Sequence, residues 1–275
     1  MNFIQLDFRV SSEEQSEIIT AYLEETGFIG SEIQDNLLSL CYQEDAFPFE
    51  EIQALCEQHQ LTFEQKTIAQ QNWNQVWESG FQPITIGNDI IVRASFHPPA
   101  PNFTWELIIT PKMSFGTGHH ATTQMMLKAI LQEDCSEKRV LDYGCGTGVL
   151  AILAAKKGAT YVLGIDIDDW CIENSEENAA LNQTACSFAL GNIDSLHESF
   201  DLILANINLN ILKENMAAIE QRMNPGGVLL LSGILESDLN SILESCNAQQ
   251  LRYVSKEICA GWMCLKVIKE ASPLA

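Results

Sequence analysis

The sequence predicts an α/β protein with a doubly wound parallel sheet, preceded by a small ferredoxin-like α+β domain. From Arg139 onward, short apolar runs alternate with helical stretches, and this alternation requires a parallel sheet covered on both faces. Before residue 66 the elements follow the order strand, helix, strand, strand, helix, strand, which is that of a ferredoxin-like module. The length of 275 residues suits two domains.

Composition argues against several classes of protein. Fifteen basic residues against 37 acidic ones give a net charge of −22, which repels polyanions, so we expect no direct nucleic-acid partner. No apolar run approaches the roughly 18 residues of a membrane-spanning helix, and no basic lead-in marks a secretory signal. We therefore expect a cytoplasmic protein with no membrane partner, and a monomer. Nine cysteines without repeated spacing resemble neither a disulfide framework nor a zinc site.

Residues 1–65 have a readable order of elements. Ser11 or Ser12 can cap the first helix, and Gly27 follows its end. Asp35-Asn36 tolerates the positive φ of a tight hairpin. In order, we expect a strand over 4–10, the capped helix, hairpin strands over 28–33 and 37–42, a helix over 49–59 and a strand over 61–68.

The same segment is strongly acidic. It contains fourteen acidic residues and only Arg9 as a basic one, which leaves it with a charge of −13. Such a segment is either a solvated surface that keeps the protein soluble or a docking surface for a basic partner. Because it has no catalytic cluster, we expect a substrate-recognition domain over residues 1–65. A helical linker over 66–80, in which Trp73 and Trp77 share a face, would join it to a catalytic domain over 81–275.

The remaining residues supply the sheet. A hairpin turning at Gly87-Asn88 comes first. We then expect strands over 140–143, 161–165, 188–190, 202–205 and 228–231, with helices over 122–131, 149–157, 209–223 and 236–246. A terminal hairpin of 251–257 with 262–268 gives the sheet an antiparallel edge. Ligands of such folds bind beyond the carboxyl ends of the strands.

Glycines and an aspartate follow the first two strands of this sheet. The first strand ends in the run DYGCGTG at 142–148, where Gly144 and Gly146 let a tight turn bring backbone N–H groups against a ligand. The second strand ends at Asp166, where a carboxylate can accept hydrogen bonds from a ribose. Because Val149 stands where a dinucleotide fingerprint has its third glycine, the pattern departs from NAD and flavin enzymes. It is the arrangement of class I S-adenosylmethionine-dependent methyltransferases.

A second glycine-rich loop lies upstream, at 115–123. Thr122 or Thr123 can cap the helix that it enters, and its glycines let it fold closely over a bound molecule. His119 and His120 are adjacent, but no third ligand stands at a telling spacing, so we predict no metal site.

Asparagines follow the fourth strand. The side chain of Asn206 offers a donor and an acceptor, so it could hold the cofactor's amino-acid moiety or orient an incoming nitrogen. Alternatively, Asn206 or Asn208 caps the following helix.

These motifs resemble one family closely. The loop FGTGxHxTT at 115–123, the turn at 142–148, GIDID at 164–168 and ANI at 205–207 look like those of the bacterial methyltransferases that modify large-subunit ribosomal protein eleven. The likeness runs from about Trp73 to the C-terminus. Departures are Ala121, Thr147 and Asn72, where the family commonly has proline, serine and an acidic residue.

The resemblance implies a seven-stranded Rossmann-like methyltransferase sheet with S-adenosylmethionine as cofactor. It also implies methylation of lysine ε-amines and of the N-terminal α-amine of that ribosomal protein, which the N-terminal domain would grip. By the family's pattern, Thr123, Gly144, Asp166 and Asn206 contact the cofactor, and Gly146 belongs to the same turn. No residue is assigned as a general base.

Other functions stay open at this point. A methyltransferase of release-factor glutamine would have Asn-Pro-Pro-Tyr after the fourth strand, whereas Asn206 is followed here by Ile207-Asn208. A small-molecule methyltransferase would share the fold, because the fold does not choose the acceptor. A non-catalytic ribosome-assembly factor and an NAD-binding oxidoreductase are the remaining alternatives.

Overall fold

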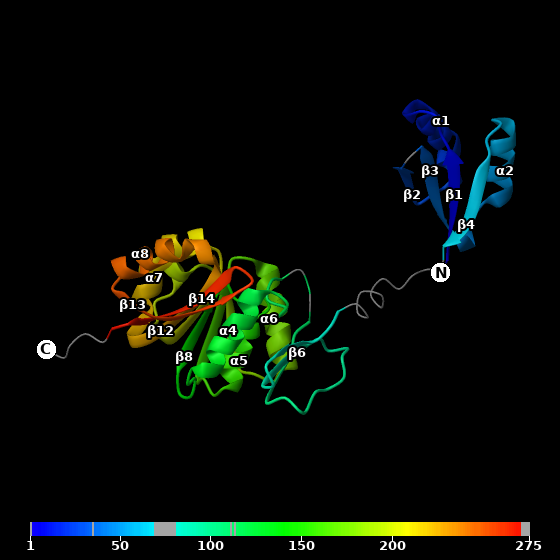
Figure 1. Ribbon diagram of the computed structural model, residues 1–275. Coiled ribbons are helices and arrows are strands. Elements are labelled where there is room, and N and C mark those ends of the chain that lie inside the picture. Colours follow the sequence, from blue (N-terminus) through cyan, green and yellow to red (C-terminus); the bar gives the residue numbers. More distant parts are fainter. Residues whose placement is uncertain (1, 35, 69–80, 111, 113, 271–275) are drawn as a thin grey trace. The chain divides into compact units, whose positions relative to one another are not determined.

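The computed structural model describes residues 2–34, 36–68, 81–110, 112 and 114–270 (Figure 1). Its contacts divide the chain into two compact units, Met1–Phe81 and Gln82–Ala275. Within the described ranges, no helix has both the length and the apolar character needed to cross a membrane. All nine cysteines are free thiols in this structure.

The N-terminal unit has the predicted ferredoxin-like order. Its four strands form an antiparallel sheet in the order β2-β3-β1-β4. The elements are β1 (Phe3–Arg9), α1 (Glu13–Leu23), η1 (Glu24–Thr26), β2 (Gly30–Gln34), β3 (Leu37–Gln43), η2 (Glu44–Ala46), α2 (Phe49–Gln58) and β4 (Phe63–Ile68). The alternation along β1 buries Ile4, Leu6 and Phe8 in one core with residues of both helices.

Local chemistry explains where these elements begin and end. Ser12 caps α1, because its hydroxyl accepts a hydrogen bond from the backbone N–H of Gln15 at 3.2 Å, while the Gln15 side chain accepts one from the N–H of Ser11 at 2.7 Å. Asn36 adopts a φ of 63° in the turn between β2 and β3. Of the predicted linker, residues 66–68 belong to β4, and residues 69–80, with both tryptophans, lie outside the described residues.

The second unit opens with a small sheet of three strands. These are β5 (Ile84–Ile86), β6 (Ile90–Arg93) and β7 (Trp105–Ile108); β5 and β6 form the predicted antiparallel hairpin, and β7 runs parallel to β6. The sequence analysis did not predict β7, because its four residues include Glu106, which breaks the apolar run. The carboxylate of Glu106 accepts a hydrogen bond from the guanidinium of the buried Arg93 at 2.6 Å.

The large sheet has seven strands in the order β10-β9-β8-β11-β12-β14-β13. The strands are β8 (Arg139–Tyr143), β9 (Tyr161–Asp166), β10 (Cys186–Leu190), β11 (Phe200–Asn206), β12 (Met223–Leu235), β13 (Leu251–Cys259) and β14 (Trp262–Lys269). Strands β8 to β12 pair in parallel, and β14 is antiparallel to both of its neighbours. The order reverses between β8 and β11, which is where such folds open a ligand crevice.

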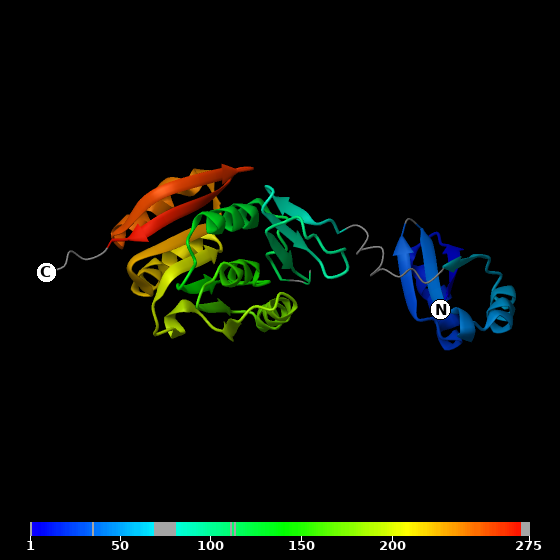
Figure 2. The same cartoon turned by 90° about the horizontal axis from the view of Figure 1, so that it is seen from below.

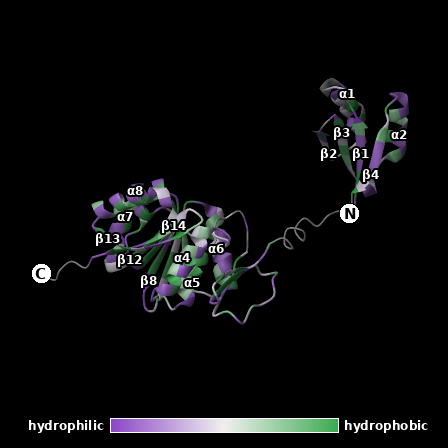
Figure 3. Ribbon diagram, in the orientation of Figure 1, coloured by the Kyte–Doolittle hydropathy of each residue, from purple (hydrophilic) through white to green (hydrophobic). Residues whose placement is uncertain are grey.

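Helices cover both faces of this sheet (Figures 1 and 2). On one face lie α4 (Ala121–Gln132), α5 (Val149–Lys156) and α6 (Asp169–Leu181); on the other lie α7 (Leu209–Gln221) and α8 (Leu239–Ala248), with short turns η3 (Ile193–Ser195) and η4 (Glu236–Asp238). The central strands of the sheet are mainly apolar (Figure 3). The doubly wound fold class is therefore confirmed.

Candidate functional site

A pocket of about 400 Å³ lies at the carboxyl ends of β8, β9 and β11. All five residues that the sequence analysis assigned to the cofactor line it, namely Thr123, Gly144, Gly146, Asp166 and Asn206. They come from helix α4 and from the ends of three strands, so only the fold brings them together.

The glycine turn between β8 and α5 requires its glycines. Gly144, Gly146 and Gly148 have φ values of 74°, 54° and 75°, the left-handed region that side chains disfavour. A Cβ on Gly144 would lie 2.4 Å from a methyl carbon of Ile207, and one on Gly146 would lie 2.4 Å from the carbonyl oxygen of Phe115. The turn is also anchored, because the N–H groups of Gly144 and Cys145 both donate to the carbonyl of Ile165.

Asp166 ends β9 and faces this turn. Its carboxylate accepts one hydrogen bond from the N–H of Gly146 at 2.9 Å and another from the N–H of Asp168 at 3.2 Å. Each carboxylate oxygen keeps a free lone-pair direction, so both can accept a further hydrogen bond. The half-buried Asp166 is thus held in one orientation by the backbone and still open to a ligand.

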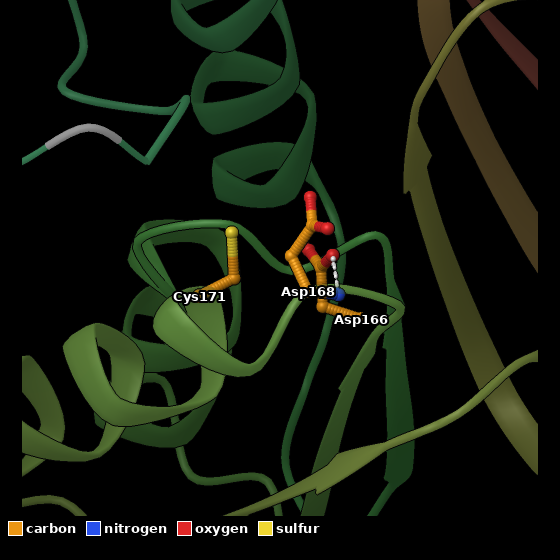
Figure 4. Close-up of side chains that lie close together, drawn as sticks. All are labelled: Asp166, Asp168 and Cys171. Atoms are coloured by element: carbon orange, nitrogen blue, oxygen red, sulfur yellow. Dashed lines mark hydrogen bonds between the residues drawn. The ribbon is translucent and has the colours of Figure 1, made fainter.

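Two further potential ligand groups lie beside Asp166. The side-chain oxygens of Asp166 and Asp168 and the thiol of Cys171 lie within 4.8 Å of one another (Figure 4). In the part of the chain that the structure describes, His119 and His120 do not belong to this group. These histidines lie instead in the loop before α4.

Asn206 lines the pocket at the end of β11. Its Nδ2 donates to the hydroxyl of Thr123 at 3.4 Å, while its Oδ1 is buried and has no hydrogen-bond partner among the described residues. The capping role proposed for Asn206 or Asn208 falls to Asn208, whose side chain accepts from the N–H of Ile211 at 3.1 Å. The acceptor capacity of Asn206 Oδ1 is therefore not used by any described residue.

The upstream glycine-rich loop is hydrogen-bonded to the glycine turn. Thr147 donates from its N–H to the carbonyl of Phe115 at 3.0 Å and from its hydroxyl to the carbonyl of Gly116 at 2.8 Å. Serine could make both bonds, so the threonine that departs from the family's pattern keeps this contact. Ser114, Phe115 and Gly116 consequently form part of the pocket wall.

The cap of α4 differs from the prediction. His120, and not Thr122 or Thr123, is the N-cap: its Nδ1 accepts from the N–H of Thr122 at 3.4 Å. Thr122 and Thr123 are inside the first turn, and Thr123 uses its hydroxyl to accept from Asn206. The imidazole of His120 also packs edgewise against Phe115 and Trp262, with ring centroids 5.5 and 4.9 Å away.

Asp142 is a buried carboxyl directly beneath the turn. Burial raises its pKa to about 8, the nearby Asp166 adds to the shift, and a hydrogen bond from the N–H of Ala151, 3.0 Å away, opposes it. Asp142 is therefore largely protonated at neutral pH. It caps the N-terminus of α5, whose own N-cap, Gly148, has no side chain.

The charge of the pocket discriminates between candidate cofactors. Asp166 and Asp168 are its acidic lining residues, and none of its described lining residues is basic. A pyrophosphate would find no cationic side chain here, whereas a sulfonium and an amino group suit this negative site. The carboxylate of Asp166 and the Oδ1 of Asn206, which has no hydrogen-bond partner among the described residues, are acceptors of the kind that the hydroxyl and amino groups of S-adenosylmethionine need.

Sequence reasoning missed part of the wall. Trp170 and Cys171, in the first turn of α6, and Ile207 after β11 line the pocket but were not proposed. Their position just after strands β9 and β11 could have indicated them, since the segments that follow the carboxyl ends of the strands form the ligand crevice in such folds.

Comparison with known proteins identifies the family. The sequence model of the ribosomal protein L11 methyltransferases (PrmA) matches residues 49–270. The chain belongs to this family. An L11 methyltransferase from Porphyromonas gingivalis is 44% identical over 84% of this chain and 82% of its own length. One from Bacteroides thetaiotaomicron is 33% identical over 97% of this chain and 99% of its own.

A solved structure of the L11 methyltransferase family agrees with the fold. The ribosomal protein L11 methylase from Lactobacillus delbrueckii subsp. bulgaricus is 27% identical, with a TM-score of 0.64, and covers 69% of this chain and 100% of its own. The resemblance inferred from the loop, turn and strand-end motifs is thereby confirmed.

Proposed function

We propose that this protein transfers methyl groups from S-adenosylmethionine to lysine ε-amines and to the N-terminal α-amine of ribosomal protein L11. Membership of the L11 methyltransferase family supports the substrate. The observation that carries the proposal is the pocket that joins Asp166 to the unpaired Oδ1 of Asn206.

Four groups would hold the cofactor. Asp166 would accept hydrogen bonds from the ribose hydroxyls, and Gly144 would let the backbone approach the ligand closely. Thr123 and Asn206, already joined by a hydrogen bond, would hold the amino-acid portion. Bound S-adenosylmethionine supplies a methyl group activated by the adjacent sulfonium.

The protein's task is to present a neutral amine and exclude water. A free lysine has a pKa of roughly 10.4, so it must lose a proton before it attacks. The apolar walls of the pocket, among them Val149, Leu150 and Ile211, favour the neutral amine, and water takes the proton. If Asn206 does not hold the amino-acid portion of the cofactor, its Oδ1 would instead accept an N–H of the amine and orient its lone pair; otherwise a backbone carbonyl would take this second role.

The charge of the N-terminal unit supports a docking role. Among the acidic side chains of this unit whose burial the structure describes, ten are exposed, namely Glu17, Glu24, Glu25, Glu32, Glu44, Asp45, Glu50, Glu51, Glu57 and Glu64. Asp7, in contrast, is buried and bound to Lys66 at 2.6 Å. An exposed acidic surface attracts a basic ribosomal protein. We therefore propose that residues 1–65 recognise the substrate, in the cytoplasm where ribosomal proteins are made.

Methyl transfer tests the activity directly. Purified L11 is incubated with the enzyme and labelled S-adenosylmethionine, and the modified amines are located by mass spectrometry. A release factor is tested in parallel as the alternative substrate, and binding of NAD is measured as the alternative to binding of S-adenosylmethionine. Label on the release factor alone, or tight binding of NAD but not of S-adenosylmethionine, would contradict the proposal.

Two variants test the assigned roles. Asn206→Ala should weaken cofactor binding or lower turnover, whereas Asn215→Ala, on α7 and outside the pocket lining, should do neither. If Asn206→Ala changes neither quantity, Asn206 does not have the proposed role. A chain without residues 1–65 should bind S-adenosylmethionine and fail to methylate L11; retained methylation would remove the docking role.

A further inference from the structure

Helix α6 and its C-cap residue, Asn182, carry three asparagines on one buried face. Asn174, Asn178 and Asn182 recur every four residues, and their exposed fractions are 0%, 0% and 6%. Buried amides must be hydrogen-bonded, and a helix interior offers them few partners of its own. Their partners lie mainly in a different segment, 64 to 74 residues away.

Asn182 pairs with the main chain at the end of β7. It accepts from the N–H of Ile108 at 3.0 Å and donates to the carbonyl of the same residue at 2.6 Å. Asn174 donates to the carbonyl of Thr110 at 3.4 Å. The side chains on this face of α6 thus hydrogen-bond to the main chain of residues 108 and 110, as the backbone of a neighbouring strand would do in a sheet.

Asn178 has an additional partner. It accepts from the N–H of Thr110 at 2.8 Å, as Asn182 accepts from Ile108, but it donates to the carbonyl of Thr147 at 2.9 Å. Thr147 lies in the glycine turn and itself donates to the carbonyls of Phe115 and Gly116. One buried amide therefore ties the glycine turn to the chain that enters the upstream loop.

We propose that Asn178 is a positioning residue for S-adenosylmethionine, which it does not touch. It sets the separation between two pocket walls, the turn of Gly144 and Gly146 and the segment of Phe115 and Gly116. The two walls lie close together, since a Cβ on Gly146 would lie only 2.4 Å from the carbonyl oxygen of Phe115. A small change in their separation should therefore alter the pocket. Asn178 is absent from the lining residues, so its effect passes through Thr147. The inference rests on the proposed function.

Asn182 provides a matched control. Both asparagines are buried, and alanine at either position removes one hydrogen bond from a backbone N–H and one to a backbone carbonyl of another segment; Asn182→Ala also removes a bond to the carbonyl of Asn178. Only Asn178 contacts the glycine turn. A role limited to stability therefore predicts similar behaviour in the two variants, whereas a positioning role separates them.

The experiment compares Asn178→Ala with Asn182→Ala in the full chain. Calorimetry measures the Kd for S-adenosylmethionine, and thermal unfolding measures stability. We expect both variants to unfold at lower temperature, and the Kd to rise about fivefold or more for Asn178→Ala and less than about twofold for Asn182→Ala. KM for S-adenosylmethionine should rise in the same ratio, with kcat at saturation retained.

If the alanine variants do not fold, a more conservative pair of substitutions, to aspartate, provides the same test. Asn178→Asp retains the acceptor for Thr110 and loses the amide donor to Thr147, so it should also weaken binding more than Asn182→Asp does. Equal changes in Kd within either pair would overturn the positioning role. A wild-type chain that binds no S-adenosylmethionine would instead overturn the proposed function.

Discussion

Replacing Gly146 by alanine tests whether the glycine turn shapes the pocket. Gly146 has a φ of 54°, and left-handed backbone costs a residue with a Cβ about 1–2 kcal/mol. The new Cβ would also lie 2.4 Å from the carbonyl oxygen of Phe115, where ordinary contact begins at 3.4 Å. That carbonyl must therefore retreat by about 1 Å, which breaks its 3.0 Å hydrogen bond from the N–H of Thr147. Loss of this bond costs about 0.5–1.5 kcal/mol more.

Gly226→Ala is the control for the backbone cost alone. Gly226 has a φ of 78°, and a Cβ there would meet nothing within 4 Å. We expect Gly226→Ala to lose about 1–2 kcal/mol and Gly146→Ala about 1.5–3.5 kcal/mol of unfolding free energy, measured by urea denaturation. Because the retreating carbonyl belongs to the pocket wall, Gly146→Ala should also raise the Kd for S-adenosylmethionine at least about tenfold. Equal losses of stability together with wild-type Kd values in both variants would refute the steric reasoning.

Three further predictions concern buried polar groups. The folded-state pKa of Asp142, about 8, exceeds its ordinary value of 3.8, so the folded protein holds the extra proton between these values and loses stability as pH rises through that window. Asp142→Asn should flatten this dependence in denaturation series from pH 5 to 8; an unchanged slope would contradict the assignment. Lys157 donates to three carbonyls at the end of α4, at 2.7 to 2.8 Å, so Lys157→Met should cost about 1–3 kcal/mol in unfolding, whereas the exposed Lys213→Met should cost little. Thr147→Ser should retain the hydrogen bond to Gly116 and the wild-type Kd for S-adenosylmethionine, while Thr147→Val should weaken binding about three- to tenfold by calorimetry; equal Kd values would show that the hydroxyl is not needed.

The candidate site was predictable where backbone geometry requires a particular residue. Gly144 and Gly146 occupy left-handed conformations that other residues disfavour, and Asp166 ends a strand whose apolar run is plain in the sequence. Since parallel strands end at one edge, the sequence could place Asn206 near them without knowledge of any contact.

The cap of α4 shows where such reasoning fails. Thr122, Thr123 and His120 all stand near the start of this helix, and helix statistics favour threonine as the cap. The hydroxyl of Thr123 instead accepts a hydrogen bond from Asn206, which is 83 residues away in the sequence. Choosing among neighbouring polar residues requires knowledge of their distant partners.

The amino-acid sequence by itself determined most of the strands and helices, the glycine turn and the acidic strand end, because these depend on periodicity and backbone preference within a few residues. Strand β7 (Trp105–Ile108) and helix α6 (Asp169–Leu181) were not among the predicted elements. Only the tertiary structure decided the role of the asparagines of α6. Asparagines on a helix ordinarily indicate a solvated face, but here the backbone of residues 108–110 and Thr147 runs past them. A buried amide acquires its function from the main chain that the fold brings beside it, and that chain lies far away in the sequence.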